Sequence, residues 1–313
     1  MDSSSLRRTA SPVLLAISTL FLLLSPHVHS ASSPPPPPPP SPISLSFPPF
    51  SPSNLLCQFD KSLNLSADLI CTPSNPPGQI VFSYDNDVIS TRYQYKKPVQ
   101  LWKKGSPYAA SFSTQFTLQF HRDAERSVKR VFGGGIAFAV TPTIDAGDSG
   151  PESFGLFKID DASGKAAGGK NPKTVAVEID TSRDVTYSWD PQIPHVGLDI
   201  SSVNSVASKF LWNGTAFIDR KIAVFIDYDA QKEVLAVRFQ NVSASGKADK
   251  AKSTLFLSYA GLSLGKTVNE MSYVGFSSRV PVTTDGVYIL YDWSFSTQWV
   301  LKKKAILLLP IRQ

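Results

Sequence analysis

Short runs of alternating apolar and polar residues dominate the chain from about residue 43 onward. Along residues 112–120 an apolar side chain recurs at every second position except 114, as in a half-buried β-strand. Two further apolar runs, at 222–226 and 234–239, flank the polar segment 227–232, which is the signature of a β-hairpin. Helical periodicity is almost missing, and more strands are expected toward the C-terminus, at 272–277 and 287–290. This pattern predicts an all-β protein built from two packed antiparallel sheets.

The first 42 residues depart from this pattern. Arg7 and Arg8 precede an apolar run at 13–24, and small residues follow near position 30, so residues 1–30 are expected to be a cleaved secretory signal peptide. The apolar run is well below the roughly 20 residues that span a bilayer, so cleavage is favoured over the alternative of a retained anchor, and no transmembrane segment is expected after cleavage. Residues 31–42 contain seven consecutive prolines and are predicted to form only an extended linker.

The C-terminal residues 298–313 form a basic and apolar tail. The chain has a net charge of +6, to which the signal peptide contributes +1 and the tail +4, leaving +1 for the body at 43–297. An almost neutral body offers no electrostatic footprint for a polyanion, so no nucleic-acid partner is expected. The apolar part of the tail is also too short to cross a membrane.

Cysteines and glycosylation motifs indicate the cell compartment. Cys57 and Cys71 fit one disulfide in an oxidising environment, with two buried thiols as the alternative. Asn-x-Ser/Thr triplets that fit the same route occur at Asn64, Asn213 and Asn241. A secreted protein of the apoplast or the cell surface is therefore expected.

The strongest chemical signal lies in the segment 175–195. On a strand at 175–180, Glu178 and Asp180 point to one face while the intervening apolar residues point to the other. Neighbouring carboxylates repel each other, and their burial is costly unless a cation or a shared proton neutralises them. Asp184, Asp190 and His195 follow closely. Oxygen ligands suit Ca²⁺, and carboxylate with imidazole suits Mn²⁺ or a similar ion, so two adjacent ion sites are predicted. The alternative is that these acids form only salt bridges and turn caps.

These residues also carry a family resemblance. The run Val-Ala-Val-Glu-Ile-Asp-Thr at 175–181, then Asp-Pro at 190–191 and His-Val-Gly-Leu-Asp at 195–199, resembles the metal-binding core of the legume lectins, the L-type domain shared with plant lectin-receptor kinases. Three other blocks match in the expected order, at 135–142, 273–277 and 293–295. The resemblance implies an antiparallel two-sheet jelly-roll sandwich of the legume-lectin type. In the receptor kinases a membrane helix and a kinase would follow, and neither is present here, so a soluble secreted form or an incomplete product of a longer gene is expected.

The resemblance also implies which residues hold the ions. Four side chains would bind the transition ion, and a fifth would reach it through water: Glu178, Asp180, Asp190 and His195, and Ser205. Calcium would share two of the acids and take two further oxygens: Asp180 and Asp190, the backbone oxygen of Ser182 and the side chain of Asp184, which is normally asparagine.

All four customary sugar contacts are altered. The aspartate that accepts hydrogen bonds from two sugar hydroxyls in the family is Gly134 here, which offers no acceptor side chain. A backbone-donating glycine, an aromatic platform and an asparagine correspond to Glu152, Ser182 and Asp184. Losing one contact to an ionised acceptor costs about 1.5–3 kcal/mol, so several losses would abolish ordinary monosaccharide affinity. Three other aromatic residues could stack on a sugar instead: Trp102, Tyr187 and Trp189. Such residues are more often packing residues, so none of them is assigned as a ligand contact.

These residues bear on three classes of function. The first is a non-catalytic lectin-like domain that binds a glycan or glycoprotein and depends on Ca²⁺ and Mn²⁺. The second is a glycoside hydrolase of the laminarinase type, which needs Glu-x-Asp-x-x-Glu; Arg183 stands in place of the last glutamate, so no enzyme is expected. The third is a receptor-type interaction module that has lost sugar binding and recognises a peptide, a hydrophobic ligand or a protein partner. The resemblance also makes a homodimer that pairs flat sheet faces, as in related lectins, an alternative to a monomer.

Overall fold

The computed structural model describes residues 37–48, 50, 55–59, 78–82, 89–122, 134–144, 154–157, 172–181, 191, 193–211, 219–243, 246–280 and 286–302. The chain divides into two units, Met1–Pro37 and Pro38–Gln313, and the elements below belong to the second. Among the described residues, no helix has the length and apolar character that a membrane crossing requires.

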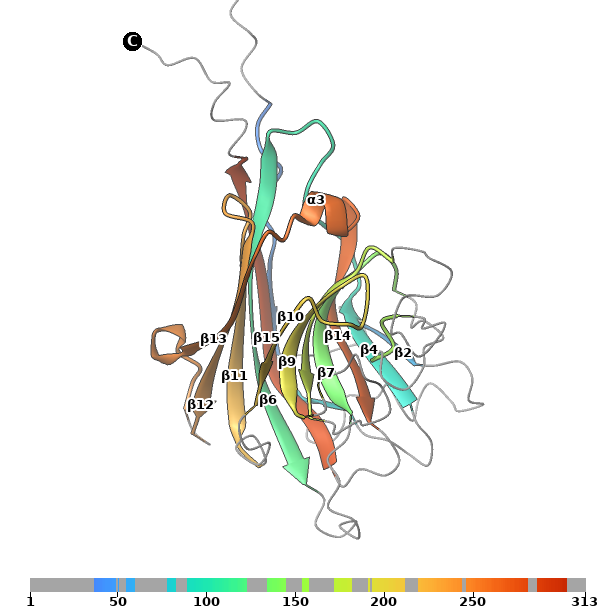
Figure 1. Cartoon of the computed structure of the whole chain (residues 1–313), viewed down its shortest axis with the longest axis vertical. Helices are drawn as coiled ribbons and strands as arrows, with labels where there is room; N and C mark the ends of the chain where they lie inside the picture. Colours follow the sequence, from blue (N-terminus) through green and yellow to red (C-terminus); the bar gives the residue numbers. More distant parts are fainter. Residues whose placement is uncertain are drawn as a thin grey trace, which may run out of the picture. The chain divides into compact units, whose positions relative to one another are not determined.

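Two antiparallel sheets make up this unit (Figure 1). The seven-stranded sheet has the order β1-β15-β6-β11-β12-β13, with β3 also paired to β15: β1 Ser44–Phe47, β3 Ile80–Phe82, β6 Tyr108–Arg122, β11 Lys221–Asp229, β12 Val234–Val242, β13 Thr254–Ala260 and β15 Gly286–Leu301. The eight-stranded sheet has the order β10-β9-β8-β7-β14-β4-β2, with β5 also paired to β14: β2 Leu55–Phe59, β4 Ile89–Tyr95, β5 Val99–Gln100, β7 Gly135–Thr141, β8 Val175–Asp180, β9 His195–Ile200, β10 Ala207–Phe210 and β14 Met271–Val280. Helical structure in the described part is limited to two short turns: η5 Lys250–Lys252 and α3 Leu264–Thr267. The prediction of an all-β, two-sheet protein is confirmed.

The strands largely follow the apolar–polar alternation. The apolar positions of 112–120 lie on β6 and are buried, as predicted. The expected hairpin is formed by β11 and β12, but its turn is shorter than predicted, because Asp227 and Asp229 continue the strand alternation on either side of the buried Tyr228. The last strand, β15, pairs with β6 as far as Leu301, four residues beyond the expected end of the sandwich at 297.

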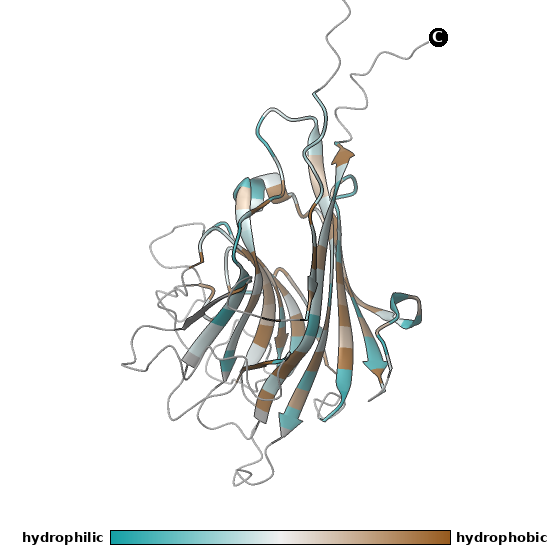
Figure 2. Ribbon diagram, turned by 180° about the vertical axis from the view of Figure 1, so that it is seen from behind, coloured by the Kyte–Doolittle hydropathy of each residue, from teal (hydrophilic) through white to brown (hydrophobic). Residues whose placement is uncertain are grey.

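Aromatic side chains fill the space between the two sheets. The ring of Trp293 on β15 stacks on Phe47 with 5.1 Å between ring centroids and meets the edge of Phe276, on β14 of the other sheet, at 5.2 Å. The Trp293 indole Nε1 donates a hydrogen bond to Thr114 Oγ1 at 3.0 Å. Figure 2 shows the corresponding hydrophobic bands on the strands of both sheets. The side chains of the inner faces therefore form the core, and the outer faces and the sheet ends are available for ligand binding.

A smaller apolar cluster covers part of the outer face of the eight-stranded sheet. Small residues on β7 and β8 meet the turn at 154–157 and one further apolar residue: Ala137, Ala139, Ala176, Phe154, Leu156, Phe157 and Val203. A Cβ at Gly135 would lie 2.5 Å from Phe154 Cε1 and 2.6 Å from the carbonyl oxygen of Ile179, so only glycine lets this turn approach the sheet. This turn lies beside the start of β7 and the end of β8, where the sequence-predicted site residues begin.

Candidate metal and ligand site

Strand β8 separates its apolar and acidic side chains as predicted. Val175, Val177 and Ile179 belong to the core between the sheets, whereas Ala176 belongs to the cluster on the opposite face. Glu178 and Asp180 share that opposite face with Ala176 because side chains alternate along a strand. In the antiparallel pairing of β8 with β9, Asp180 lies opposite His195 and Glu178 opposite Gly197. The two acids and the histidine are therefore presented on one sheet face.

Glu178, His195 and Ser205 meet at close range. His195 Nε2 lies 3.0 Å from Glu178 Oε1, and the Ser205 hydroxyl donates to the same carboxylate oxygen at 2.6 Å. The side chains of His195 and Glu178 are 0% and 2% exposed, respectively. Burial of a carboxylate at this depth is favourable only when a positive charge and several hydrogen bonds compensate for its lost hydration.

The hydrogen bond at Nδ1 of His195 indicates that a positive charge is required at Nε2. His195 Nδ1 lies 3.2 Å from the carbonyl oxygen of Ile193, which can only accept, so Nδ1 carries a proton. In a neutral imidazole, Nε2 would then have a lone pair facing the carboxylate of Glu178, and two acceptors at 3.0 Å repel each other. A second ring proton or a bound cation resolves this conflict. Metal-bound histidines commonly donate their other ring N–H to a backbone carbonyl.

Gly197 leaves the space that this cluster occupies. A Cβ at Gly197 would lie 2.1 Å from Ser205 Oγ and 2.2 Å from Glu178 Oε1, well inside van der Waals contact. Both polar groups therefore fill the volume of a missing side chain. The space above Gly197 is lined by a carboxylate and a hydroxyl, and together with the imidazole of His195 this set of donor groups fits a transition ion.

Asp199 belongs to the same cluster, although the sequence interpretation did not assign it. The residue is fully buried, and its Oδ1 lies 2.8 Å from Ser205 Oγ, so the single hydroxyl proton is shared between Asp199 and Glu178. The signal was available in the sequence, since His195, Gly197 and Asp199 alternate along β9 and so share one face. Ser205 is thus positioned by two buried carboxylates.

The candidate sugar position Gly134 lies next to the acidic strand. Its carbonyl oxygen accepts hydrogen bonds from the backbone N–H and from the hydroxyl of Thr181, both at 3.0 Å. Thr181 Oγ1 also lies 2.8 Å from the hydroxyl of Tyr288. Burial raises the pKa of Tyr288, the Thr181 bond opposes this rise, and the charge of Asp180 adds to it, so the phenol stays neutral. Thr181 therefore links the end of β8 to the Gly134 backbone.

Several expected site residues lie outside the described part of the chain. These are Ser182, Asp184 and Asp190 of the expected ion sites and Glu152 of the expected sugar site. Within the described residues alone, no group of three or more His, Cys, Asp or Glu side chains is arranged to hold a metal ion. The cluster at Glu178 and His195 would therefore depend on further ligands from 182–190.

The expected modification sites are described only in part. Asn241 is exposed near the end of β12, whereas Asn64 and Asn213 lie outside the described residues. Cys57 lies in β2, but its side chain and all of Cys71 are likewise outside them. The disulfide and glycosylation at these positions stay predictions.

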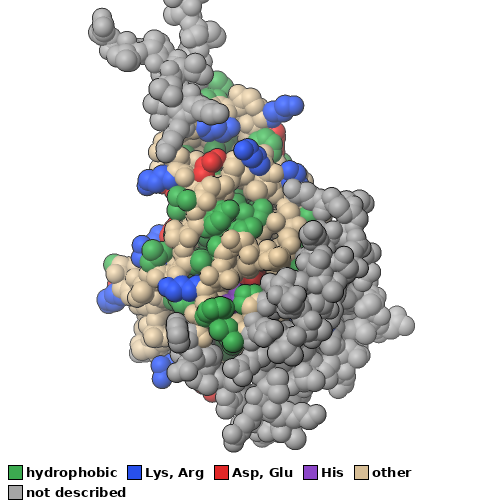
Figure 3. Space-filling view, in the orientation of Figure 1, with side chains coloured by type: hydrophobic (Ala, Val, Ile, Leu, Met, Phe, Trp, Pro, Cys, Tyr) green, Lys and Arg blue, Asp and Glu red, His purple; other side chains and the backbone are tan. Residues whose placement is uncertain are grey.

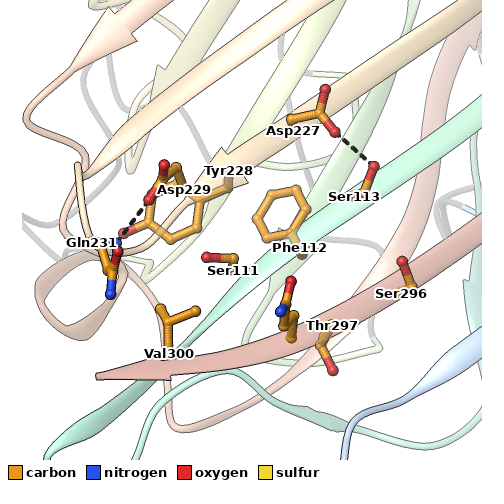
Figure 4. Close-up of a pocket in the computed structure, with 11 residues that line it drawn as sticks. Ser111, Phe112, Ser113, Asp227, Tyr228, Asp229, Gln231, Ser296, Thr297 and Val300 are labelled. Carbon is orange, nitrogen blue, oxygen red and sulfur yellow. Dashed lines mark hydrogen bonds between the residues drawn. The ribbon is translucent and has the colours of Figure 1, made fainter. Parts of the chain in front are cut away.

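Two other features of the described surface carry no ligand argument. A groove of about 380 Å³ lies over β6, β11 and β15, but its acids are already engaged: Asp227 with Ser113 and Lys250, and Asp229 with Gln231 and Lys232 (Figure 4). The hydrogen bond from Lys232 holds the pKa of Asp229 below its usual range, as expected for a satisfied carboxylate. Trp102 is half-buried and donates to the carbonyl oxygen of Val268 at 3.0 Å, which agrees with a packing role.

Comparisons with known proteins complete this picture. The family model described as "Legume lectin domain" matches residues 44–308. The erythroagglutinating phytohemagglutinin of Phaseolus vulgaris is 28% identical over 295 residues, which cover 92% of each chain. The L-type lectin-domain containing receptor kinase VIII.1 of Arabidopsis thaliana is 32% identical over 209 residues, which are 66% of this chain and 26% of the kinase. The metal-free form of lectin I-B4 from Griffonia simplicifolia superposes with a TM-score of 0.64 at 25% identity, covering 82% of this chain and 99% of that one.

Proposed function

Because the chain belongs to the legume lectin domain family, we propose that it is a secreted, non-catalytic carbohydrate-binding protein that depends on bound Ca²⁺ and Mn²⁺ and has an altered sugar site. The family and its jelly-roll sandwich agree with the resemblance and the fold class predicted from the motifs. The observation that carries the proposal is the buried meeting of Glu178, His195 and Ser205 on the sheet face that also presents Asp180 beside Gly134.

The donor atoms on this face support ion binding. Glu178 and His195 would hold the transition ion, and Asp180, which is 7% exposed, would contribute to both ions. Ser182, Asp184 and Asp190 would complete the two shells, and Ser205 would act through water. Bound ions would supply the positive charge that the buried carboxylates require. The ion-binding residues would then hold the end of β8 in a fixed conformation. Thr181 would extend this effect to the Gly134 backbone, to which it is hydrogen-bonded.

Sugar recognition at position 134 must differ from that of the family. Gly134 has no carboxylate, and its carbonyl oxygen already accepts two hydrogen bonds from Thr181. Saccharide binding in a shallow site depends on a few charge-assisted hydrogen bonds and on ring stacking. We therefore expect weak monosaccharide binding and recognition of a glycan through other groups.

A second candidate function is an interaction module for a peptide, a hydrophobic ligand or a protein partner. Position 134 favours this function, because the face proposed to hold the ions is kept while Gly134 has no acceptor side chain for a sugar and its carbonyl oxygen already accepts from Thr181. Assembly into a homodimer through flat sheet faces is compatible with either function and is kept as a proposal.

The ion sites can be tested by replacing Asp180 with alanine. The variant should lose both Ca²⁺ and Mn²⁺ binding, because one carboxylate is proposed to serve both ions. Titration calorimetry on the parent and on Asp180→Ala measures this directly, with Asp229→Ala as a control acid on the other sheet. Unchanged binding of either ion in Asp180→Ala would remove Asp180 from that ion's shell.

The ligand class can be tested on a glycan array, with and without a chelator. The parent should retain oligosaccharides only when ions are present, and Gly134→Asp should gain monosaccharide affinity of about tenfold or more, since a charge-assisted hydrogen bond contributes about 1.5–3 kcal/mol. Aspartate is a suitable replacement because it tolerates the left-handed φ of +75° at this position better than most side chains. A folded, ion-loaded parent that retains no glycan would favour the interaction module instead.

A further inference from the structure

A hollow of about 500 Å³ opens at the end of the seven-stranded sheet where β11 begins and β12 ends. This volume is within the range of about 300–1,000 Å³ that is typical of small-molecule sites. The lining comes from both of these strands, from β13 and from residues next to them: Arg220, Ile222, Phe239, Gln240, Asn241, Lys252, Thr254 and Phe256. Among the residues that the structure describes, no acidic side chain lines this hollow, which is here called the β12–β13 pocket.

The inner part of the β12–β13 pocket is aromatic. The rings of Phe239 and Phe256 meet edge to face, with 5.0 Å between their centroids and 76° between their planes. Ile222, which is 2% exposed, adds an aliphatic surface from β11. Both phenylalanines are half-buried and contact the core, so their rings are held in place yet remain reachable. Such a surface favours a flat apolar group.

The rim of the β12–β13 pocket is cationic. Arg220 and Lys252 line it and are exposed. Lys209, on edge strand β10 of the other sheet, places its Nζ 4.9 Å from the centroid of the Phe256 ring. Within the described part of the chain, Lys252 Nζ lies 3.5 Å from Asp249 Oδ2; both side chains of this pair are well exposed, so Asp249 neutralises little of the Lys252 charge. Figure 3 shows the same mixture on the side that carries these strands, with apolar side chains among Lys and Arg.

We propose that the β12–β13 pocket binds a small organic monoanion with an aromatic or similarly apolar ring and one carboxylate. The ring packs on Phe239 and Phe256, and the carboxylate pairs with Arg220 and Lys252. Guanidinium groups suit this role because their fork of donors matches the two oxygens of a carboxylate. The anion binds without a metal ion and apart from the Gly134 face, so this proposal stands independently of glycan binding.

Glycosylation would regulate access to the β12–β13 pocket. Asn241 lies on its wall and is the acceptor of an Asn-Val-Ser triplet. A glycan there would place a bulky group at the opening, so the unmodified protein should bind the anion more tightly. Enzymatic release of the glycan would convert Asn241 to aspartate and add a repelling charge, so Ser243→Ala is the better way to obtain the unmodified form.

The experiment uses 2-naphthoate as the probe and 2-naphthamide, its neutral counterpart of similar shape, on the full secreted chain carrying Ser243→Ala. Calorimetry or ligand-observed NMR should show naphthoate binding about tenfold tighter than naphthamide, with a preference that falls as salt rises. Arg220→Gln and Lys252→Gln should each weaken naphthoate binding about twofold to fivefold and leave naphthamide binding unchanged. Both changes are on exposed side chains and should leave the fold intact. Lys103→Gln, an exposed cation outside the pocket, is the control.

Three results would overturn the proposal: no binding of either probe, equal binding of acid and amide, or naphthoate affinity that neither charge variant alters. A Phe256→Leu variant adds a check on the apolar half, because it should weaken both probes alike. A chelator should not affect naphthoate. Loss of glycan retention with intact naphthoate binding would reject the proposed lectin function alone, and the reverse result would reject the pocket alone.

Discussion

Replacing Gly197 with alanine is expected to weaken transition-ion binding by about 100-fold, the upper end of the effect of disturbing groups that orient metal ligands. The new Cβ would stand 2.1 Å from Ser205 Oγ and 2.2 Å from Glu178 Oε1, so at least one of these groups must leave its place. Displacing Ser205 would break its hydrogen bonds to Glu178 and Asp199, and displacing Glu178 would break its contact with His195.

The stability of Gly197→Ala should fall in two parts. Without ions, crowding of the buried cluster should lower the free energy of unfolding by about 1–3 kcal/mol. With ions, the parent gains about 2.7 kcal/mol at a free ion concentration of 100 Kd, and the variant should lose this gain. Calorimetry with Mn²⁺ and thermal unfolding with and without ions measure both parts.

A matched glycine serves as control for this prediction. Gly265→Ala places its Cβ no closer than 3.8 Å to Trp102, which is ordinary contact, so it should leave ion binding and stability nearly unchanged. Parent-like Mn²⁺ affinity in Gly197→Ala would mean that Glu178 and Ser205 are not part of the ion site.

Replacing Trp293 with alanine is expected to lower the free energy of unfolding by about 3–5 kcal/mol, the usual cost of removing a large buried aromatic side chain. Trp293 is 1% exposed and contacts both Phe47 and Phe276, so its removal opens a cavity where the two sheets meet. The change should destabilise the ion-free and ion-loaded forms equally, since Trp293 packs on the inner faces and the ion cluster lies on an outer face. Urea unfolding with and without ions measures the two values.

The Trp293→Phe variant separates packing from hydrogen bonding. Phenylalanine keeps a ring against Phe47 and Phe276 but cannot donate to Thr114 Oγ1. Its cost should therefore be smaller, about 1–3 kcal/mol. A Trp293→Ala variant as stable as the parent would contradict the packing of the two sheets around this residue.

Together these two predictions separate scaffold from site. Trp293 tests the sandwich itself, and Gly197 tests the cluster that the sandwich presents. A protein that loses ion binding but stays folded would show that the β-sandwich does not depend on its ions. The metal-free form of lectin I-B4 is a protein of similar fold determined in that state.

The sequence alone determined the fold class and the direction of the key side chains. Alternation with a period of two is a local property of a strand. The burial of the apolar positions within 112–120 and the shared face of Glu178 and Asp180 could therefore be predicted without any knowledge of strand order. The motif blocks at 135–142, 175–199, 273–277 and 293–295 indicated the family, which the match over 44–308 shows.

The tertiary structure decided which of these residues meet. Strand register sets which residue of β9 lies opposite each residue of β8, and it brings Gly197 opposite Glu178, which explains a glycine that sequence reasoning passed over. The role of Asp199 likewise depends on the turn after β9, which returns Ser205 to it, and the role of Thr181 depends on Gly134, 47 residues earlier in the chain. The β12–β13 pocket depends on β11 and β13 beginning where β12 ends, and on Lys209 reaching Phe256 from the other sheet. Such contacts are set by strand pairing and packing between distant residues. The apolar–polar alternation along one strand carries no information about either.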